Sequence, residues 1–248
     1  QRGFMMSKSF KEVSGALVVV AFGILAVAAV FLNVGGLGAT EPAVEIPAPT
    51  VDPADNQGGL RTAVLAGGCF WGVQAVFQHT DGIEQAVSGY AGGTTEGPSY
   101  RQVTTGRTGH AESVAIRYDP AKISYGKILQ IFFSVVHDPT QLNRQGPDIG
   151  THYRSAIFTT TDEQKRVAEA YIAELDAAGA YSKPIVTEIA PLAKFYQAED
   201  YHQDYATLYP NQPYIRYHDL PKIENMKAMF PDYWREDPKL VFGDKGSG

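Results

Sequence analysis

A buried strand, a glycine turn and a helix are predicted in immediate succession around one residue. The apolar run 63–66 is typical of a buried strand, and the run 73–78 has the apolar spacing of a helix. Gly67 and Gly68 permit the tight turn between them. Cys69, the only cysteine of the chain, is therefore expected at or near the first residue of a helix.

This position predicts a reactive thiol at Cys69. Backbone N–H groups in the first turn of a helix have no partner within the helix, and the helix dipole is positive there, so a thiolate is favoured. Phe70 and Trp71 follow directly and predict an apolar pocket beside the sulfur. Free cysteines are also common as inert core residues, so position alone leaves a nucleophile and a structural cysteine equally open.

Composition excludes several classes of function. The formal net charge is -6 without a basic cluster, which argues against nucleic acid as a partner. A single cysteine excludes an intramolecular disulfide and a cysteine-based zinc site. No pair of His or Cys stands at helical ligand spacing, so no metal site is expected.

The N-terminal part of the chain has the pattern of a membrane segment. Lys8 and Lys11 belong to a basic flank, residues 1–12, and residues 13–40 carry no charge. The apolar stretch is close to the roughly 17–25 residues that span a bilayer, which favours an uncleaved transmembrane anchor over a signal sequence. The positive-inside rule then places the rest outside the cytoplasm, on a periplasmic or extracytoplasmic face. Cleavage after Ala39 would instead release a secreted protein.

Three segments follow the membrane segment. Residues 41–59 contain prolines, small residues and acids, and they predict an extended linker. A folded domain is expected over residues 60–237, and a tail over residues 238–248. Because the first residue is Gln, Met5 or Met6 is the expected initiator.

Strands and helices alternate through the domain, with a long polar loop over residues 137–150 that is expected to be functional. Strands are predicted over 83–90, 112–118, 153–159 and 185–189, and helices over 124–136, 162–178, 199–209 and 222–229. Because the strands are separated by helices and are not all parallel, we expect an α+β fold. Its form would be a two-layer α/β sandwich with a mixed, largely antiparallel sheet and a ferredoxin-like core.

Composition and spacing leave the chemistry at Cys69 open. A histidine base, either His110, His152 or His202, would make a cysteine–histidine hydrolase. A carboxylic acid such as Glu112 would instead protonate an oxygen while the sulfur attacks. A tethered binding module with a structural cysteine is a third alternative.

Several ordered motifs resemble the peptide methionine sulfoxide reductase A family. The resemblance covers roughly residues 60–231, and its specificity is high because so many motifs must coincide in order. In chain order the motifs are Gly68-Cys69-Phe70-Trp71-Gly72, Ser88-Gly89-Tyr90-Ala91-Gly92-Gly93, Gly106-Arg107-Thr108-Gly109-His110-Ala111-Glu112, His137-Asp138-Pro139-Thr140-Gln141, Gly150-Thr151-His152-Tyr153-Arg154-Ser155, and Phe195 with Ala198-Glu199-Asp200-Tyr201-His202-Gln203.

The resemblance implies an enzyme that reduces methionine-S-sulfoxide, free or in oxidised proteins, to methionine and so repairs proteins, without a bound cofactor. It implies that Cys69 attacks the sulfoxide sulfur and becomes a sulfenic acid. It also implies that Glu112 donates a proton to the oxygen, for which a partly apolar site must raise its pKa.

The same resemblance assigns the contacts with the substrate. The aromatic pair after the cysteine would hold the methyl group, two phenols would hydrogen-bond the oxygen, and an aspartate in the long loop would position the site. These residues are Phe70, Trp71, Tyr100, Tyr153 and Asp148, with His202 and Tyr214 as further candidates.

The chain departs from the many family members that resolve the sulfenic acid with a second cysteine. Thr104-Thr105 and Pro213-Tyr214-Ile215 stand where such cysteines often occur. The chain therefore resembles the single-cysteine subgroup, which implies an external reductant: a thioredoxin-like protein, a glutaredoxin or a small thiol. Free thiols are scarce outside the cytoplasm, which leaves the reductant open. A monomer is expected.

Overall fold

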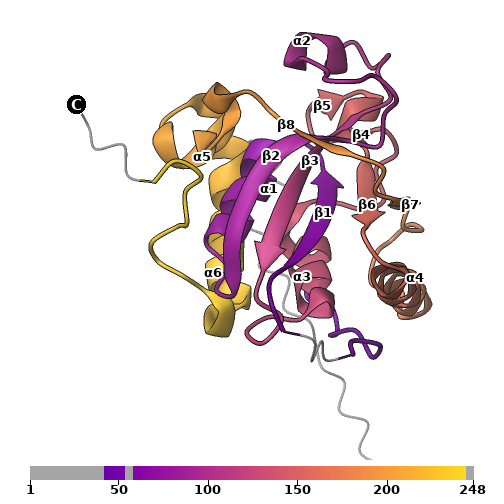
Figure 1. Ribbon diagram of the computed structural model, residues 1–248. Helices are drawn as coiled ribbons and strands as arrows, with labels where there is room; N and C mark the ends of the chain where they lie inside the picture. Colours follow the sequence, from indigo (N-terminus) through magenta and orange to yellow (C-terminus); the bar gives the residue numbers. More distant parts are fainter. Residues whose placement is uncertain (1–41, 54–57, 244–248) are drawn as a thin grey trace, which may run out of the picture. The chain divides into compact units, whose positions relative to one another are not determined.

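The computed structural model describes residues 42–53 and 58–243 of the 248-residue chain. One six-stranded sheet, in the order β7-β6-β1-β3-β2-β8, runs through the domain (Figure 1). Its strands are β1 (Arg61–Gly67), β2 (Ile83–Ala91), β3 (Ala111–Tyr118), β6 (Ser155–Thr159), β7 (Glu188–Pro191) and β8 (Phe195–Gln197); a separate hairpin is formed by β4 (Arg144–Gln145) and β5 (Asp148–Ile149).

Helices and helical turns connect these strands. The α-helices are α1 (Phe70–Gln78), α2 (Tyr100–Val103), α3 (Tyr125–Ile131), α4 (Asp162–Ala177), α5 (Tyr205–Leu208) and α6 (Leu220–Met229). Two π-helical turns, η1 (Phe132–Val136) and η4 (Ile215–Asp219), continue α3 and precede α6. Three short 3₁₀ turns are η2 (Thr151–Tyr153), η3 (Asp200–His202) and η5 (Pro231–Tyr233).

Antiparallel pairings build the centre of the sheet. Strand β3 lies between β1 and β2, and β6 pairs with the other edge of β1, all antiparallel. With α1 between β1 and β2 and α3 between β3 and β6, the connectivity is β-α-β-β-α-β, that of a ferredoxin-like core. Strand β7 pairs in parallel with β6. The prediction of a mixed, largely antiparallel sheet is confirmed.

Successive side chains of each strand point to opposite faces of the sheet. Leu65 of β1 and Val114 and Ile116 of β3 are fully buried in the large core cluster, together with Phe77 of α1. Burying each of these side chains contributes roughly 1.5–3 kcal/mol. Figure 1 shows α1 and α3 covering this face. The opposite face is covered by the chain that leads to β8, where Phe195 packs on a smaller cluster.

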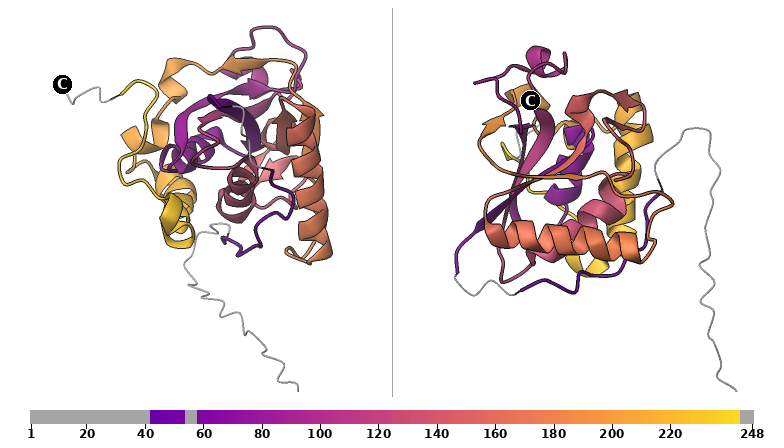
Figure 2. Two further views of the ribbon diagram at one scale, coloured as in Figure 1. Left: turned by 60° about the horizontal axis from the view of Figure 1, so that its bottom comes forward. Right: turned by 90° about the vertical axis from the view of Figure 1, so that its right-hand side faces the viewer.

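The segment before β1 differs from the linker predicted over residues 41–59. Residues 42–53, here called the N-terminal arm, form no helix or strand, but they pack on the domain. Ile46 is only 6% exposed, and the Pro47 carbonyl accepts a hydrogen bond of 2.6 Å from the Tyr171 hydroxyl of α4. Figure 2 shows the arm, in indigo, passing α3 and α4. The arm therefore packs on the domain although it is extended, because its backbone carbonyls can accept side-chain hydrogen bonds.

The tail predicted over residues 238–248 also packs in its described part. The Lys239 backbone N–H donates to the Gln78 carbonyl at 3.0 Å, and its ammonium contacts Glu84 at 2.5 Å. The carboxylate of Asp204 accepts further backbone N–H groups from residues 241 and 242. Contacts with α1 and Asp204 therefore continue past residue 237.

The helix predicted over residues 199–209 is wrong. Asp204 adopts a left-handed φ of 60° and separates the 3₁₀ turn η3 from α5. Its buried carboxylate accepts a hydrogen bond of 2.6 Å from the Gln78 amide of α1, so a tertiary contact holds the backbone in this conformation.

None of the helices within residues 42–53 and 58–243 is long and apolar enough to cross a bilayer. The basic flank and the membrane segment predicted over residues 1–12 and 13–40 lie outside the residues that the structure describes.

Candidate active site

Cys69 lies at the N-cap of α1, as predicted, and is 7% exposed. Gly68 takes a φ of 91°, which turns the chain from β1 into the helix and is readily adopted only by glycine. A Cβ at this position would also lie 2.6 Å from the Gln145 side chain of β4. The turn therefore requires glycine both for its backbone angle and for the close approach of the hairpin.

The pKa of the Cys69 thiol is raised well above its ordinary value. Burial is the largest cause, and the negative charges of Glu112, Asp219 and Asp148 act in the same direction. A hydrogen bond from the Trp71 backbone N–H opposes them. The helix terminus that was expected to favour a thiolate is in place, but burial and the surrounding acids shift the pKa in the opposite direction.

Glu112 of β3 lies directly beside the start of α1. It is 2% exposed, and its Oε2 accepts a hydrogen bond of 3.1 Å from the Phe70 backbone N–H. Burial raises the pKa of its carboxyl from 4.5 to about 8; the Phe70 hydrogen bond opposes this, and the charges of Asp148 and Asp219 add to it. At neutral pH the carboxyl is therefore mostly protonated and can donate a proton next to Cys69.

Two phenols reach the same region from separate segments. Tyr100 is the first residue of α2, and Tyr153 is the last residue of η2. Burial, then the charges of Glu112 and Cys69, raise the pKa of Tyr100 to about 12, while a hydrogen bond from Tyr153 opposes the shift. The pKa of Tyr153 is also raised, by burial first and then by Glu112. Both phenols therefore remain neutral hydrogen-bond donors close to the acid and the sulfur.

An aromatic cluster surrounds His202. Its ring centre lies 5.1 Å from that of Phe70, 6.0 Å from that of Trp71 and 4.4 Å from that of Tyr100. The side chain is buried, and neither ring nitrogen has a hydrogen-bond partner among the described residues. Burial lowers the pKa of the imidazole. The structure therefore places a neutral ring in an aromatic wall, which is not the environment of a charged base.

A small pocket opens beside Cys69, with a volume of about 20 Å³, which is room for a water-sized group. The hairpin β4–β5 supplies Asp148, whose carboxylate accepts a hydrogen bond of 2.5 Å from the Tyr214 hydroxyl. The other side of the pocket comes from η4 and α6. Its lining residues are Cys69, Gln145, Gly146, Pro147, Asp148, Tyr214, His218 and Lys222.

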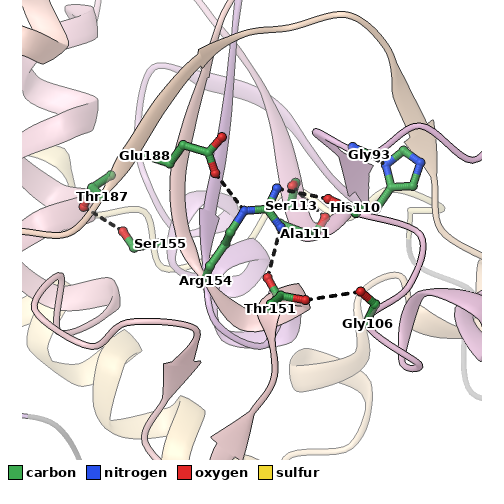
Figure 3. Close-up of polar contacts among 11 residues, drawn as sticks. Gly93, Gly106, His110, Ala111, Ser113, Thr151, Arg154, Ser155, Thr187 and Glu188 are labelled. Atoms are coloured by element: carbon green, nitrogen blue, oxygen red, sulfur yellow. Dashed lines mark hydrogen bonds and ion pairs between the residues drawn. The ribbon is translucent and has the colours of Figure 1, made fainter.

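The other two candidate histidines have structural surroundings. The Nδ1 of His110 accepts the Gly93 N–H at 3.1 Å, and its Nε2 hydrogen-bonds the Thr95 carbonyl at 2.8 Å. Figure 3 shows the ring of His110 beside Gly93. His152 packs on the ring of Tyr153, with centroids 4.1 Å apart. Within the described ranges no histidine hydrogen-bonds the cysteine, and no three His, Cys, Asp or Glu side chains form a group that could hold a metal ion.

Arg154 ties together the segments that carry these groups. Its guanidinium donates to the Thr151 carbonyl at 3.0 Å and to the Gly109 carbonyl at 3.1 Å, and its Nε pairs with Glu188 of β7 at 2.9 Å. Figure 3 shows it between these segments. Gly109 leads into β3, and Thr151 begins the turn that ends at Tyr153. One side chain therefore holds the loops that deliver the acid and a phenol.

Sequence reasoning missed two charged residues at the site. Asp219 is fully buried, and its carboxyl lies 3.6 Å from the ammonium of Lys222, which is itself 9% exposed. Burial raises the pKa of Asp219 to about 6, and the lysine opposes the shift. An acid and a lysine three residues apart at the start of a helix are typical of a solvated surface pair. Nothing in the local pattern indicates their burial.

The fold and the site define a thiol-dependent oxidoreductase: a single buried cysteine meets a protonated carboxyl and neutral phenols. Residues 61–233 match the family model described as peptide methionine sulfoxide reductase. The chain is 58% identical over 183 residues to peptide methionine sulfoxide reductase MsrA 2 of Mesorhizobium japonicum, covering 74% of this chain and 94% of the relative. It is 50% identical over 190 residues to MsrA 2 of Synechocystis sp., covering 75% and 89%.

Solved structures agree with these sequence matches. Reduced Mxr1 from Saccharomyces cerevisiae is similar with a TM-score of 0.58 and 33% identity, over 68% of this chain and 96% of that chain. Methionine sulfoxide reductase A of Corynebacterium diphtheriae is similar with a TM-score of 0.54 and 37% identity, over 70% and 87%. The chain belongs to the peptide methionine sulfoxide reductase A family, and the resemblance seen in its motifs is confirmed.

Proposed function

We propose that this protein reduces methionine-S-sulfoxide, in oxidised proteins and as the free amino acid, to methionine through a sulfenic acid on Cys69. Membership of the family supports the reaction. The roles of the residues rest on one observation: the buried carboxyl of Glu112 hydrogen-bonds the Phe70 N–H directly after the cysteine. A proton donor and a nucleophile are thereby held at the same end of α1.

In the first half-reaction the Cys69 sulfur attacks the sulfur of the sulfoxide. This attack forms a transient bond between the two sulfurs. The oxygen then moves to the Cys69 sulfur while the sulfoxide S–O bond and the transient S–S bond break, which leaves a sulfenic acid on Cys69 and methionine with its sulfur reduced by two electrons. Glu112 gives its proton to the oxygen, and the proton of the thiol replaces it on the carboxyl. Because Cys69 begins as a thiol, no proton from solvent is needed for this step.

The surrounding rings orient the sulfoxide. The hydroxyls of Tyr100 and Tyr153 donate to the oxygen as its negative charge develops. Phe70 and Trp71, with His202 beside them, form the wall against which the substrate's methyl group packs. Burying a methyl group contributes only about 0.8 kcal/mol. The wall therefore serves mainly to orient the sulfoxide, so that its sulfur faces Cys69 while its oxygen faces the hydrogen-bond donors.

An external thiol completes the cycle, because the chain contains no second cysteine. A thiolate attacks the sulfur of the sulfenic acid and forms a mixed disulfide, while the hydroxyl leaves with a proton as water. A second thiol then releases Cys69. We favour a thioredoxin-like protein over a glutaredoxin or a small thiol, since Leu142 and Ile149 beside the pocket are 68% and 72% exposed and offer an apolar contact for a protein.

We also propose that the enzyme acts as a monomer, anchored in a membrane with the catalytic domain on the periplasmic or extracytoplasmic side. The uncharged segment 13–40 after Lys8 and Lys11 supports this placement. The protein is isolated from the membrane and soluble fractions of the producing cell with antibodies against the domain, and its peptides are identified by mass spectrometry. An intact peptide from residues 13–40 supports the anchor, whereas a domain that starts after Ala39 in the soluble fraction shows a cleaved signal.

The reaction is tested by a single turnover without reductant. The protein is mixed with methionine-S-sulfoxide, and the released methionine and the mass of the peptide with Cys69 are measured. About one methionine per protein and one added oxygen on Cys69 are expected. The R epimer is the matched control and should release none. Equal methionine from Cys69→Ser, or an acyl-enzyme with ester substrates in place of methionine release, would overturn the proposal.

A further inference from the structure

A lysine lines the same small pocket as Cys69. Lys222 lies in the first turn of α6, and it is 9% exposed, which is rare for this residue type unless the ammonium is paired. Its ammonium lies 3.6 Å from Asp219, which ends η4. The positive charge is therefore held inside the protein, at a pocket that Asp148 of the β4–β5 hairpin also lines.

Asp219 itself is fully buried against α1. Apart from the ion pair, neither of its carboxyl oxygens has a hydrogen-bond partner among the described residues. A Cβ at Gly72 would lie 2.2 Å from one of these oxygens and 3.2 Å from the Cδ of Lys222. The glycine three residues after the cysteine therefore lets the charged pair approach the first turn of the catalytic helix.

The charges around the thiol are unbalanced without this lysine. Three acids act on Cys69, each from a different element: Glu112 from β3, Asp148 from β5 and Asp219 from η4. The neutral phenols Tyr100, Tyr153 and Tyr214 and the imidazole of His218 also face this region. Within the described part of the chain, Lys222 is the lysine that lines the pocket.

We propose that Lys222 is a positioning residue whose positive charge stabilises the thiolate of Cys69. The negative charge of Asp219, paired with Lys222, weakens this stabilisation. A lysine next to a cysteine favours the charged form of the sulfur, and an acid bound to the lysine weakens that effect. This rests on the proposed function, because a thiolate is needed twice in the cycle. The Cys69 thiol becomes a thiolate as it gives up its proton and attacks the sulfoxide, and Cys69 leaves the mixed disulfide as a thiolate when the external thiol regenerates the enzyme.

The pH dependence of alkylation tests the pair. Iodoacetamide reacts with the thiolate, and the single cysteine of the full chain makes the signal specific. Asp219→Asn removes the acid without changing its shape and should accelerate alkylation at neutral pH about 3- to 10-fold, since one unit of pKa is a factor of ten. Adding Lys222→Met in the D219N background should abolish this gain, whereas adding Lys222→Arg should keep most of it.

The matched control is Lys227→Met in the D219N background. Lys227 lies on the same helix, but it is exposed and pairs with Glu236, so it should not change alkylation. Equal rates for D219N and D219N/K222M would overturn the role of the lysine, and a D219N rate no higher than the wild-type rate would overturn the role of the acid. If the double variant does not fold, the alkylation rate of D219N still tests the role of Asp219: a rate above that of the wild type supports the role, and an equal or lower rate overturns it. The wild-type single turnover is measured alongside: its failure would contradict the reductase function, not the charged pair.

Discussion

The carboxyl of Glu112 accepts a hydrogen bond of 3.1 Å from the backbone N–H of Phe70, the residue after the reactive cysteine. Strand β3 and helix α1 thereby hold a buried carboxyl at the end of the helix where Cys69 lies. Of the N–H groups at this helix terminus, that of Phe70 holds the acid, while that of Trp71 hydrogen-bonds Cys69. Burial then keeps that acid protonated at neutral pH.

Glu112→Gln should slow the single-turnover release of methionine by about 10²-fold or more at pH 7, because the amide cannot supply a proton. The pKa of Glu112 is about 8, so the carboxyl carries its proton below this pH and loses it above. The wild-type rate should therefore fall as pH rises through about 8. Rapid-quench measurements from pH 6 to 10 check both statements. Glu163→Gln, an exposed acid on α4, is the control; a full rate for E112Q would remove Glu112 from the acid role.

His202→Phe should keep the rate of methionine release within about threefold, provided that the variant folds. The imidazole is buried in an aromatic wall without a hydrogen-bond partner among the described residues, and a ring of similar shape fills the same space. Single-turnover rates and thermal unfolding are measured together. A rate loss of a hundredfold at unchanged stability would instead make His202 the base that a hydrolase-like mechanism requires.

Arg154→Met should lower the turnover number and the free energy of unfolding. The guanidinium makes three contacts that hold the loop before β3, the turn at Thr151 and strand β7, and unpaired carbonyls left behind cost about 1–3 kcal/mol. Arg154→Lys should restore little of the turnover number or the stability, because a lysine ammonium cannot reproduce the planar array of N–H donors of the guanidinium. Steady-state kinetics and urea unfolding are measured, with Arg166→Met on the exposed face of α4 as control. A change in stability with an unchanged turnover number would limit Arg154 to a structural role.

Asp52→Ala should lower the free energy of unfolding by about 1–2 kcal/mol without changing the single-turnover rate. The Asp52 carboxylate in the N-terminal arm accepts hydrogen bonds from the Ser124 hydroxyl and, at 2.9 Å, from the Gly126 N–H, and so caps α3. Urea unfolding of the purified protein measures the difference, and Glu45→Ala, an exposed acid of the same arm, is the control. An unchanged stability would mean that the arm contributes nothing to the fold in solution.

Local sequence patterns predicted the elements near the cysteine well. Glycines that adopt a left-handed backbone and apolar runs of fixed period act over a few residues, so β1, the turn and α1 follow from the chain itself. The helix over residues 199–209 failed because the hydrogen bond that holds Asp204 in its left-handed conformation comes from Gln78, far away in the sequence. The N-terminal arm was taken for a linker for the same reason, since its partners lie on α3 and α4.

The amino-acid sequence by itself determined the family and the position of Cys69 at the start of a helix, and its motifs pointed to Glu112 as the candidate acid. These depend on residue types in a fixed local order. Only the tertiary structure decided the charges at the site, because a pKa depends on burial and on neighbours from distant segments. It raises the pKa of the Cys69 thiol and of the Glu112 carboxyl, and it buries Asp219 and Lys222 near them.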